Sequence, residues 1–196
     1  MPPQRSPNQW AFQDQYLKYF VFANANYNSR TFDLDDQTLI DQVVAETQLG
    51  GADGLNPNLQ TFVGGGGKLL MYHGWSDPAL SPYISVNYYN SVAAVLGSAT
   101  TNEVRLFMVP GMHHCALSGP GPNTFDTLTP ITQWVESGLA PNSMIATHYI
   151  DNDPTQAADR TMPLCAYPTL AHYNGGAIDQ ASSWSCPALA HAAASP

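Results

Sequence analysis

The sequence predicts an α/β fold in which helices flank a mostly parallel sheet. Two short apolar runs, Lys68–His73 and Glu103–Val109, have the length and composition of buried strands. A longer segment with the apolar spacing of an amphipathic helix follows each run, over residues 82–97 and then over residues 125–137. The order strand, helix, strand, helix, with apolar strands, is typical of βαβα units on a parallel sheet.

Composition supports a packed domain and excludes several classes of partner. Hydrophobic residues make up 44% of the 196 residues, and charged residues only 11%, against about 25% in an ordinary domain. Six basic residues against fifteen acidic ones give a net charge of −9, which argues against binding to nucleic acid or to an anionic membrane surface. No apolar run approaches the roughly 20 residues that span a bilayer, so we expect no membrane helix.

The segment before the first strand contains one well-defined helix. Residues 1–9 are polar and Pro-rich and are predicted to form a disordered leader. Residues 10–32 are rich in aromatic side chains, with weak helical spacing in their first half. The apolar residues of 34–49 follow a 3.6-residue period, with Asp35 or Asp36 as the N-cap and two glycines at the end.

The remaining segments carry weaker patterns. Residues 50–67 are rich in Gly, Asn and Pro and are predicted to form a loop. Residues 144–150 are predicted to add an edge strand, and 151–196 to form irregular, cysteine-containing structure.

Candidate functional residues follow both predicted strands. Asp77 lies a few residues beyond the first strand, and the pair His113–His114 lies at the corresponding point after the second. Functional groups collect beyond the carboxyl ends of parallel strands. A carboxylate followed 37 residues later by a histidine has the spacing and order of the acid and base in an α/β-hydrolase triad. The acid orients the imidazole, which then takes the proton of a serine hydroxyl.

Other interpretations of these residues stay open. An Asp after a turn glycine, or a histidine in a loop, is often only a polar surface residue. His113, His114 and Cys115 resemble metal ligands, but three consecutive residues reach one ion with difficulty and no second cluster completes the site. The chain contains no G-x-S-x-G motif, and Ser76 adjoins the proposed acid. The sequence therefore holds two of the three members of a triad.

Several segments together resemble the tannase/feruloyl esterase family, which also contains mono(hydroxyethyl) terephthalate hydrolase. Residues 66–77 are similar to the acid-bearing segment of that family, and Val109–Cys115 to its G-M-x-H-C segment. The likeness runs from about residue 10 to residue 188 and includes three further stretches: Phe125–Pro130, Trp134–Glu136, and Pro163–Pro168 with the later Cys186.

The resemblance implies the C-terminal part of an α/β-hydrolase fold, with the tail of a lid region at the N-terminus. Residues 10–50 would be this tail and the return to the sheet, 51–150 the part with acid and base, and 151–196 a disulfide-containing extension. Asp77 would be the triad acid and His114 the base, with no catalytic role for its neighbour. The implied enzyme is a serine carboxylic ester hydrolase that acts on feruloyl, galloyl or related aromatic acid esters.

The resemblance also assigns the three cysteines. Cys165 would pair with Cys186, and Cys115 with a cysteine beside the nucleophilic serine in a part of the enzyme outside this chain. Met162 stands where the family usually has Arg, which affects local contacts and not the chemistry. The reaction needs no cofactor, and the family's structural calcium belongs to the lid, so no metal is expected here.

We therefore expect a C-terminal fragment that lacks the serine nucleophile and is catalytically incomplete alone. Its partners would be an aromatic ester and the missing N-terminal part of the enzyme. The full-length protein would be secreted or periplasmic, although the N-terminus of this chain has no signal peptide. The alternatives are a subunit linked by a disulfide or a non-catalytic remnant, acting as a binding module.

Overall fold

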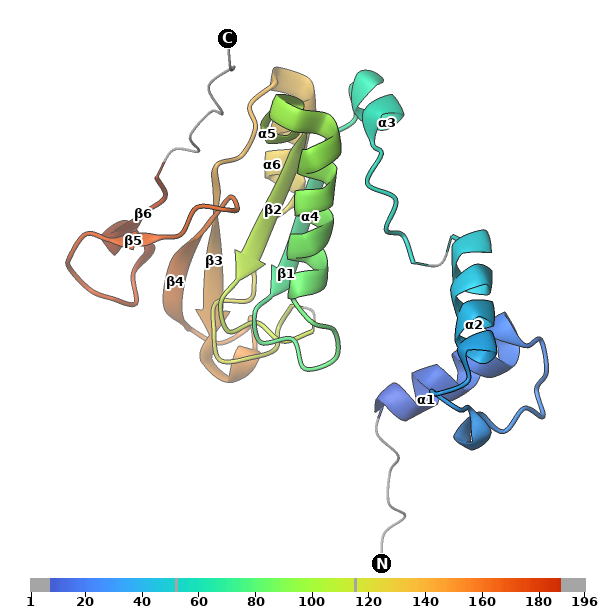
Figure 1. The fold of residues 1–196 in the computed structure, drawn as a ribbon. Helices are drawn as coiled ribbons and strands as arrows, with labels where there is room; N and C mark the ends of the chain where they lie inside the picture. The colour runs from blue at the N-terminus through green and yellow to red at the C-terminus, as the bar shows by residue number, and fades with distance from the viewer. Residues whose placement is uncertain (1–7, 52, 115, 188–196) are drawn as a thin grey trace, which may run out of the picture. The chain divides into compact units, whose positions relative to one another are not determined.

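The computed structural model describes residues 8–51, 53–114 and 116–187 and divides the chain into two compact units (Figure 1). Unit 1 ends at Leu55 and unit 2 begins at Asn56. Most of the predicted leader lies outside the described residues, and helix α1 already begins at Asn8. No helix among the described residues has the length and apolar character needed to cross a membrane.

Unit 1 is helical in its described residues. The Asp36 carboxylate accepts hydrogen bonds from the N–H groups of Thr38 and Leu39 at 2.9 and 3.4 Å, and Gly50 follows the last helical residue. The helix predicted from residues 34–49 and its aspartate N-cap are thereby confirmed. The elements in order are α1 (Asn8–Gln15), the π-helical η1 (Tyr16–Val21), η2 (Ser29–Thr31) and α2 (Gln37–Leu49).

Unit 2 is organised around a parallel pair of strands with a helix between them in sequence. β1 (Leu69–Gly74) pairs with β2 (Val104–Val109) in a register that runs from Leu69 opposite Val104 to Gly74 opposite Val109. The predicted strand–helix–strand order is confirmed, with bounds that differ by one residue. The other elements up to β2 are α3 (Gln60–Gly64) inside the predicted loop, α4 (Tyr83–Leu96), η3 (Gly97–Ala99) and α5 (Thr100–Glu103).

Strand β2 is the centre of the core, because every one of its residues is buried. Side chains alternate between the two faces of a strand, and the two faces of β2 contact different partners. On one face Val104, Leu106 and Met108 pack against Val86, Tyr89 and Val92 of α4. On the other, Phe107 and Val109 pack with Met112, Met144, Ala146, Leu164 and Ala166. The carboxyl end of β2 is therefore held firmly in place.

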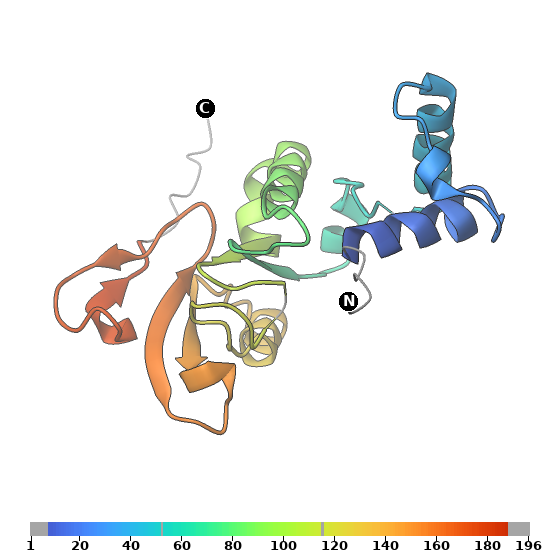
Figure 2. The same cartoon turned by 90° about the horizontal axis from the view of Figure 1, so that it is seen from below.

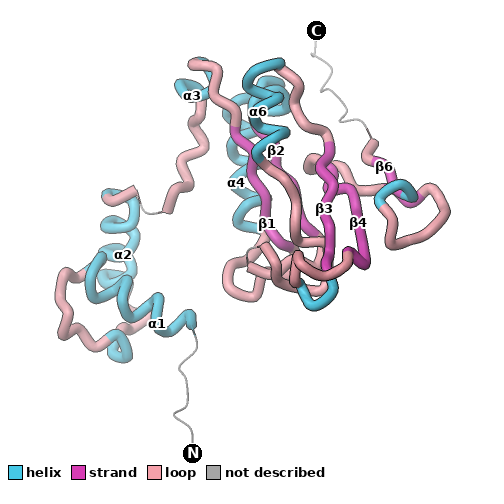
Figure 3. The backbone as a smooth tube through the Cα atoms, turned by 180° about the vertical axis from the view of Figure 1, so that it is seen from behind, coloured by secondary structure: helices cyan, strands magenta, loops and turns pink. Residues whose placement is uncertain are grey.

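The prediction of a mostly parallel sheet is only partly correct. Among the described residues there are three two-stranded ladders, and only β1–β2 is parallel. β3 (Ser143–Tyr149) and β4 (Ala158–Cys165) form an antiparallel ribbon that lies beside β2 (Figure 3), where the N–H of Tyr167 donates to the Leu106 carbonyl at 2.8 Å. β5 (His172–Tyr173) and β6 (Trp184–Ser185) form a second, short antiparallel pair.

Two secondary-structure assignments predicted from the sequence are also wrong. Residues 158–165 form β4 instead of irregular structure; the proline at position 163 disfavours a strand, but an edge position accommodates it. Helix α6 (Leu128–Ser137) begins three residues late, because the Asp126 carboxylate accepts hydrogen bonds from the N–H groups of Leu128 and Thr129. The remaining short helices are η4 (Ile150–Asn152) and η5 (Ala181–Ser183).

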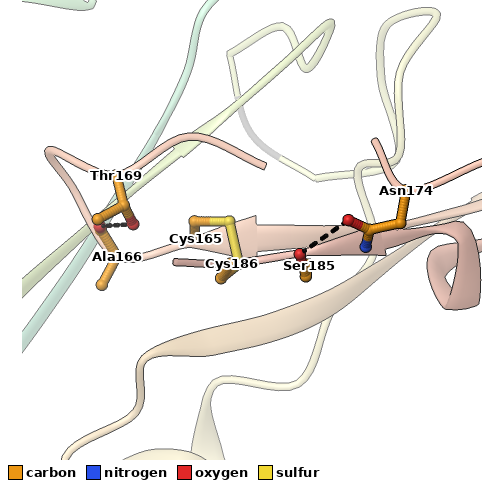
Figure 4. The surroundings of a disulfide bond; sticks show 6 residues. All are labelled: Cys165, Ala166, Thr169, Asn174, Ser185 and Cys186. Atoms are coloured by element: carbon orange, nitrogen blue, oxygen red, sulfur yellow. Dashed lines mark hydrogen bonds between the residues drawn. A yellow bond between two sulfur atoms is a disulfide. The ribbon is translucent and has the colours of Figure 1, made fainter. Parts of the chain in front are cut away.

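The chain after β4, residues 166–187, is named the C-terminal arm. It contains β5, η5 and β6 and returns beside β4 (Figure 2). A disulfide joins Cys165 at the end of β4 to Cys186 after β6, two positions that are 21 apart in the sequence. Within the arm, the Thr169 hydroxyl donates to the Ala166 carbonyl at 2.7 Å (Figure 4).

Candidate active site

The loops that follow β1 and β2 meet at one end of the parallel pair. The Trp75 N–H donates to the Val109 carbonyl at 2.9 Å, and the Ser76 N–H donates to the Met112 carbonyl at 3.1 Å. Backbone pairing thus continues past the last residues of both strands. We name this region, residues 74–80 with the described residues of 109–123, the strand-end corner.

Two glycines allow the backbones of the corner to approach closely. A Cβ atom at Gly74 would overlap the backbone oxygens of Met112 and His113. A Cβ atom at Gly119, whose φ of +102° also favours glycine, would overlap the Gly111 carbonyl oxygen. The absence of a side chain at Gly74 therefore lets the loop after β1 approach the loop after β2, and its absence at Gly119 lets the loop after β2 fold back on itself.

This close approach places Asp77 against His114. The His114 Nδ1–H donates to Asp77 Oδ2 at 2.7 Å. The Asp77 side chain is only 2% exposed, whereas that of His114 is 50% exposed. Within the described part of the chain, the Nε2 atom of His114 makes no hydrogen bond, so this nitrogen is free to accept a proton from an incoming group.

The Asp77 carboxylate has four hydrogen-bond donors. Oδ1 accepts from the N–H groups of Ala79 and Leu80 at 2.8 and 3.0 Å, and Oδ2 accepts from His114 and from His73 Nε2 at 3.0 Å. Burial would raise the pKa of Asp77, but the hydrogen bonds from Leu80, His114, Ala79 and His73 outweigh it and hold the pKa well below its usual range. The acid is therefore ionised at neutral pH.

The structure brings some of the predicted residues together and separates others. Asp77 and His114, expected to be neighbours, are hydrogen-bonded. His113, expected to have no role, uses its backbone N–H to bind the Ser118 carbonyl at 3.1 Å. Cys165 and Cys186 are joined, as the resemblance implied, whereas Cys115 lies outside the described residues.

Sequence reasoning missed His73, the second histidine bound to Asp77. Its sequence signal was weak. His73 lies four residues before the acid and was assigned to the predicted strand as its last residue, so it was not considered as a site residue. In the described part of the chain, no three or more His, Cys, Asp and Glu side chains are grouped so as to hold a metal ion.

Comparison with known proteins finds that this chain is similar to esterases and hydrolases. The protein-family model for tannase and feruloyl esterase matches residues 5–187. Mono(2-hydroxyethyl) terephthalate hydrolase from Piscinibacter sakaiensis is 42% identical over 132 residues, which cover 67% of this chain and 21% of that protein.

Solved structures show the same similarity. An esterase from Aspergillus oryzae superposes with a TM-score of 0.78 at 25% identity and covers 93% of this chain and 38% of that one. Feruloyl esterase B from Aspergillus oryzae superposes with a TM-score of 0.70 at 28% identity, covering 89% and 37%. The chain thus spans about a fifth of the hydrolase and under two fifths of each solved chain.

Proposed function

The chain belongs to the tannase and feruloyl esterase family, and on that premise we propose that it supplies the acid and base of a carboxylic ester hydrolase. Asp77 is the acid and His114 the general base. The observation that carries the proposal is the 2.7 Å hydrogen bond from the half-exposed imidazole to a buried, ionised carboxylate. A surface histidine of no function does not require such a partner.

In the proposed mechanism a serine hydroxyl attacks the ester carbonyl, and His114 Nε2 takes the hydroxyl proton. The Asp77 carboxylate keeps the other ring nitrogen protonated and stabilises the imidazolium that forms. His114 then gives its proton to the leaving alcohol as the acyl–oxygen bond breaks. A water molecule repeats the sequence on the acyl-enzyme, releasing the acid and restoring the serine.

The nucleophile in this proposal comes from outside the 196 residues. The chain spans only about a fifth of the terephthalate hydrolase that it matches, which supports this assignment. Within the described residues, no serine hydroxyl is hydrogen-bonded to the imidazole of His114. Cys115 would then form a disulfide with a cysteine beside the missing serine, and the complete enzyme would be secreted.

Esters of aromatic acids are the proposed substrates. Trp75 of the strand-end corner and Tyr83 at the start of α4 have ring centroids 5.6 Å apart in an edge-to-face arrangement, and the two residues are 37% and 62% exposed. Exposed aromatic rings beside a catalytic pair provide an apolar surface for a phenolic ring. The names of the feruloyl esterase and terephthalate hydrolase relatives agree with this substrate class.

A chimeric enzyme tests the proposal. In feruloyl esterase B from Aspergillus oryzae, the residues that align with 56–187 are replaced by those of this chain, and hydrolysis of methyl ferulate is measured. We expect the chimera to hydrolyse methyl ferulate. The His114→Ala substitution should lower its turnover by about 10⁴-fold or more, because the base is lost. The matched control, His113→Ala, should stay within a few-fold of the chimera.

Two results contradict the proposal. One is a folded, active chimera in which His114→Ala leaves turnover unchanged or His113→Ala abolishes it. The other is robust hydrolysis of methyl ferulate by the 196-residue chain alone, which is inconsistent with an external nucleophile.

A further inference from the structure

His73 connects the proposed acid to helix α4. It lies on β1 four residues before Asp77, and its side chain is 12% exposed. The Nε2–H of His73 donates to Asp77 Oδ2 at 3.0 Å, and the Nδ1 atom lies 2.7 Å from the hydroxyl oxygen of Ser85 on α4. Both ring nitrogens therefore have partners, although the proposed reaction uses neither of them.

The hydrogen bonds of Asp77 hold its carboxylate in a single orientation. An ionised carboxylate accepts about four hydrogen bonds and donates none. Two backbone N–H groups occupy Oδ1, and the rings of His73 and His114 both bind Oδ2. Because all four sites are used, a rotation of the carboxylate breaks at least one hydrogen bond.

Asp77 determines which nitrogen of His73 carries the proton, because an ionised carboxylate can only accept a hydrogen bond. A neutral imidazole has one N–H group. The His73 Nε2 atom must carry this hydrogen to bind Asp77, so Nδ1 is an acceptor and the Ser85 hydroxyl donates to it. The Ser85 hydroxyl thus holds the His73 ring at its other nitrogen, and the Asp77 oxygen that accepts from His73 also accepts from the Nδ1–H of His114.

We propose that His73 and Ser85 are positioning residues that fix the direction of the Asp77 carboxylate and so hold His114 in the tautomer with Nε2 free. The inference rests on the proposed function, in which Asp77 and His114 are the acid and the base. The four groups form one chain of hydrogen bonds, Ser85 to His73 to Asp77, with His114 donating to the same oxygen as His73.

Nuclear magnetic resonance of the full chain with ¹⁵N-labelled histidine tests this role, because ring ¹⁵N shifts report which nitrogen is protonated. In the wild type at neutral pH, the His114 signals should show the proton on Nδ1. His73→Phe keeps a ring but has no donor, so the signals should move toward the opposite tautomer. Ser85→Ala should cause a smaller move in the same direction.

Two further variants act as controls. His73→Gln keeps an N–H donor for Asp77 and should retain the wild-type tautomer of His114. Ser91→Ala removes another hydroxyl from α4, one that donates to the Asn87 carbonyl within the same helix, and should change nothing.

Wild-type His114 signals in both His73→Phe and Ser85→Ala would overturn the inference. If His73→Phe fails to fold, Ser85→Ala decides, because it removes a single hydroxyl oxygen. The measurement needs no nucleophile and no substrate. The expected tautomer shifts together with an active chimera that His114→Ala leaves unchanged would therefore refute the proposed function alone. Unchanged shifts together with a chimera that depends on His114 would refute only the positioning role.

Discussion

The strand-end corner and the C-terminal arm belong to the same unit but are held in place by different means. The corner relies on backbone hydrogen bonds between two loops and on close contact at Gly74, beside the end of the fully buried strand β2. The arm has two strands of two residues each, exposed apolar side chains such as Leu170 and Ile178, and a disulfide.

The comparison shows what each kind of constraint provides. A disulfide limits how far a segment with few buried side chains can move from the rest of the unit, but the side chains of that segment keep considerable freedom. Backbone contact without intervening side chains fixes two loops to within a fraction of an ångström, which an acid–base pair requires. The predictions that follow separate the two effects, in order of decreasing size.

Gly74→Ala should have the largest effect, because it would break the corner. Its new Cβ would overlap two backbone oxygens that cannot move without displacing the loop after β2, at a cost of about 3 kcal/mol or more. Urea unfolding should show this loss, and the hydrogen-bonded His114 signal should disappear. Gly64→Ala, at a position with open space, is the control and should be nearly neutral. A stable Gly74→Ala protein with an intact signal would contradict the close-contact argument.

Removal of the disulfide should destabilise the arm and spare the corner. The double variant Cys165→Ala with Cys186→Ala should lose about 3 kcal/mol of unfolding free energy, from the chain entropy of a loop of this length. The wild type under reducing conditions should behave in the same way. The comparison fails if the His114 signals change in the folded double variant.

Asp77→Asn should weaken the corner in a pH-dependent way. The variant should lose about 2 kcal/mol at neutral pH, since a carboxylate with four donors becomes an amide. The folded-state pKa of Asp77 is lowered, so its contribution is complete above the usual aspartate pKa of about 3.9 and declines as the pH falls below it. Unfolding of both proteins at pH 7 and pH 3 should show a smaller difference at pH 3. A difference that grows on acidification would refute the ionised acid.

Thr161→Val should have the smallest effect, and only on the arm. The Thr161 hydroxyl accepts a hydrogen bond from the N–H of Ala181 at 2.9 Å, and losing it should cost about 1 kcal/mol. Thr61→Val, at an exposed position on α3, is the matched control. Hydrogen exchange at Ala181 should accelerate without a change at Ser76, whereas acceleration at both would show that the two regions are coupled.

The sequence was sufficient for the parts of the fold in which one local signal dominates. Strands β1 and β2, the helix between them and the Asp36 cap follow from apolar spacing and capping chemistry. Asp77 and His114 were predicted to be neighbours because each follows one of these two parallel strands. The existence of β4 was not predicted, because its pairing with β3 depends on contacts between segments that are separate in sequence and its proline opposes a strand.

The second histidine of the site was hidden for a similar reason. His73 lies next to the last residue of β1, and the sequence pattern of a strand does not reveal what a polar side chain at that position contacts. Its importance depends on Ser85, twelve residues further along and on another element, which sequence spacing does not connect to it. A role that depends on contacts between different helices and strands can be recognised only in the folded structure.

The pairing of Gly74 with Val109 determines where insertions and deletions can be tolerated. Three positions separate Gly74 from Asp77 and five separate Val109 from His114, and a change in either count would move one group out of reach of the other. The part of the chain between the loop of Asp77 and the start of β2, which includes α4, is not constrained in this way, since it can lengthen or shorten while the strand register stays the same. Among related chains, the distance in sequence between the two residues should vary freely, and the two short counts should not.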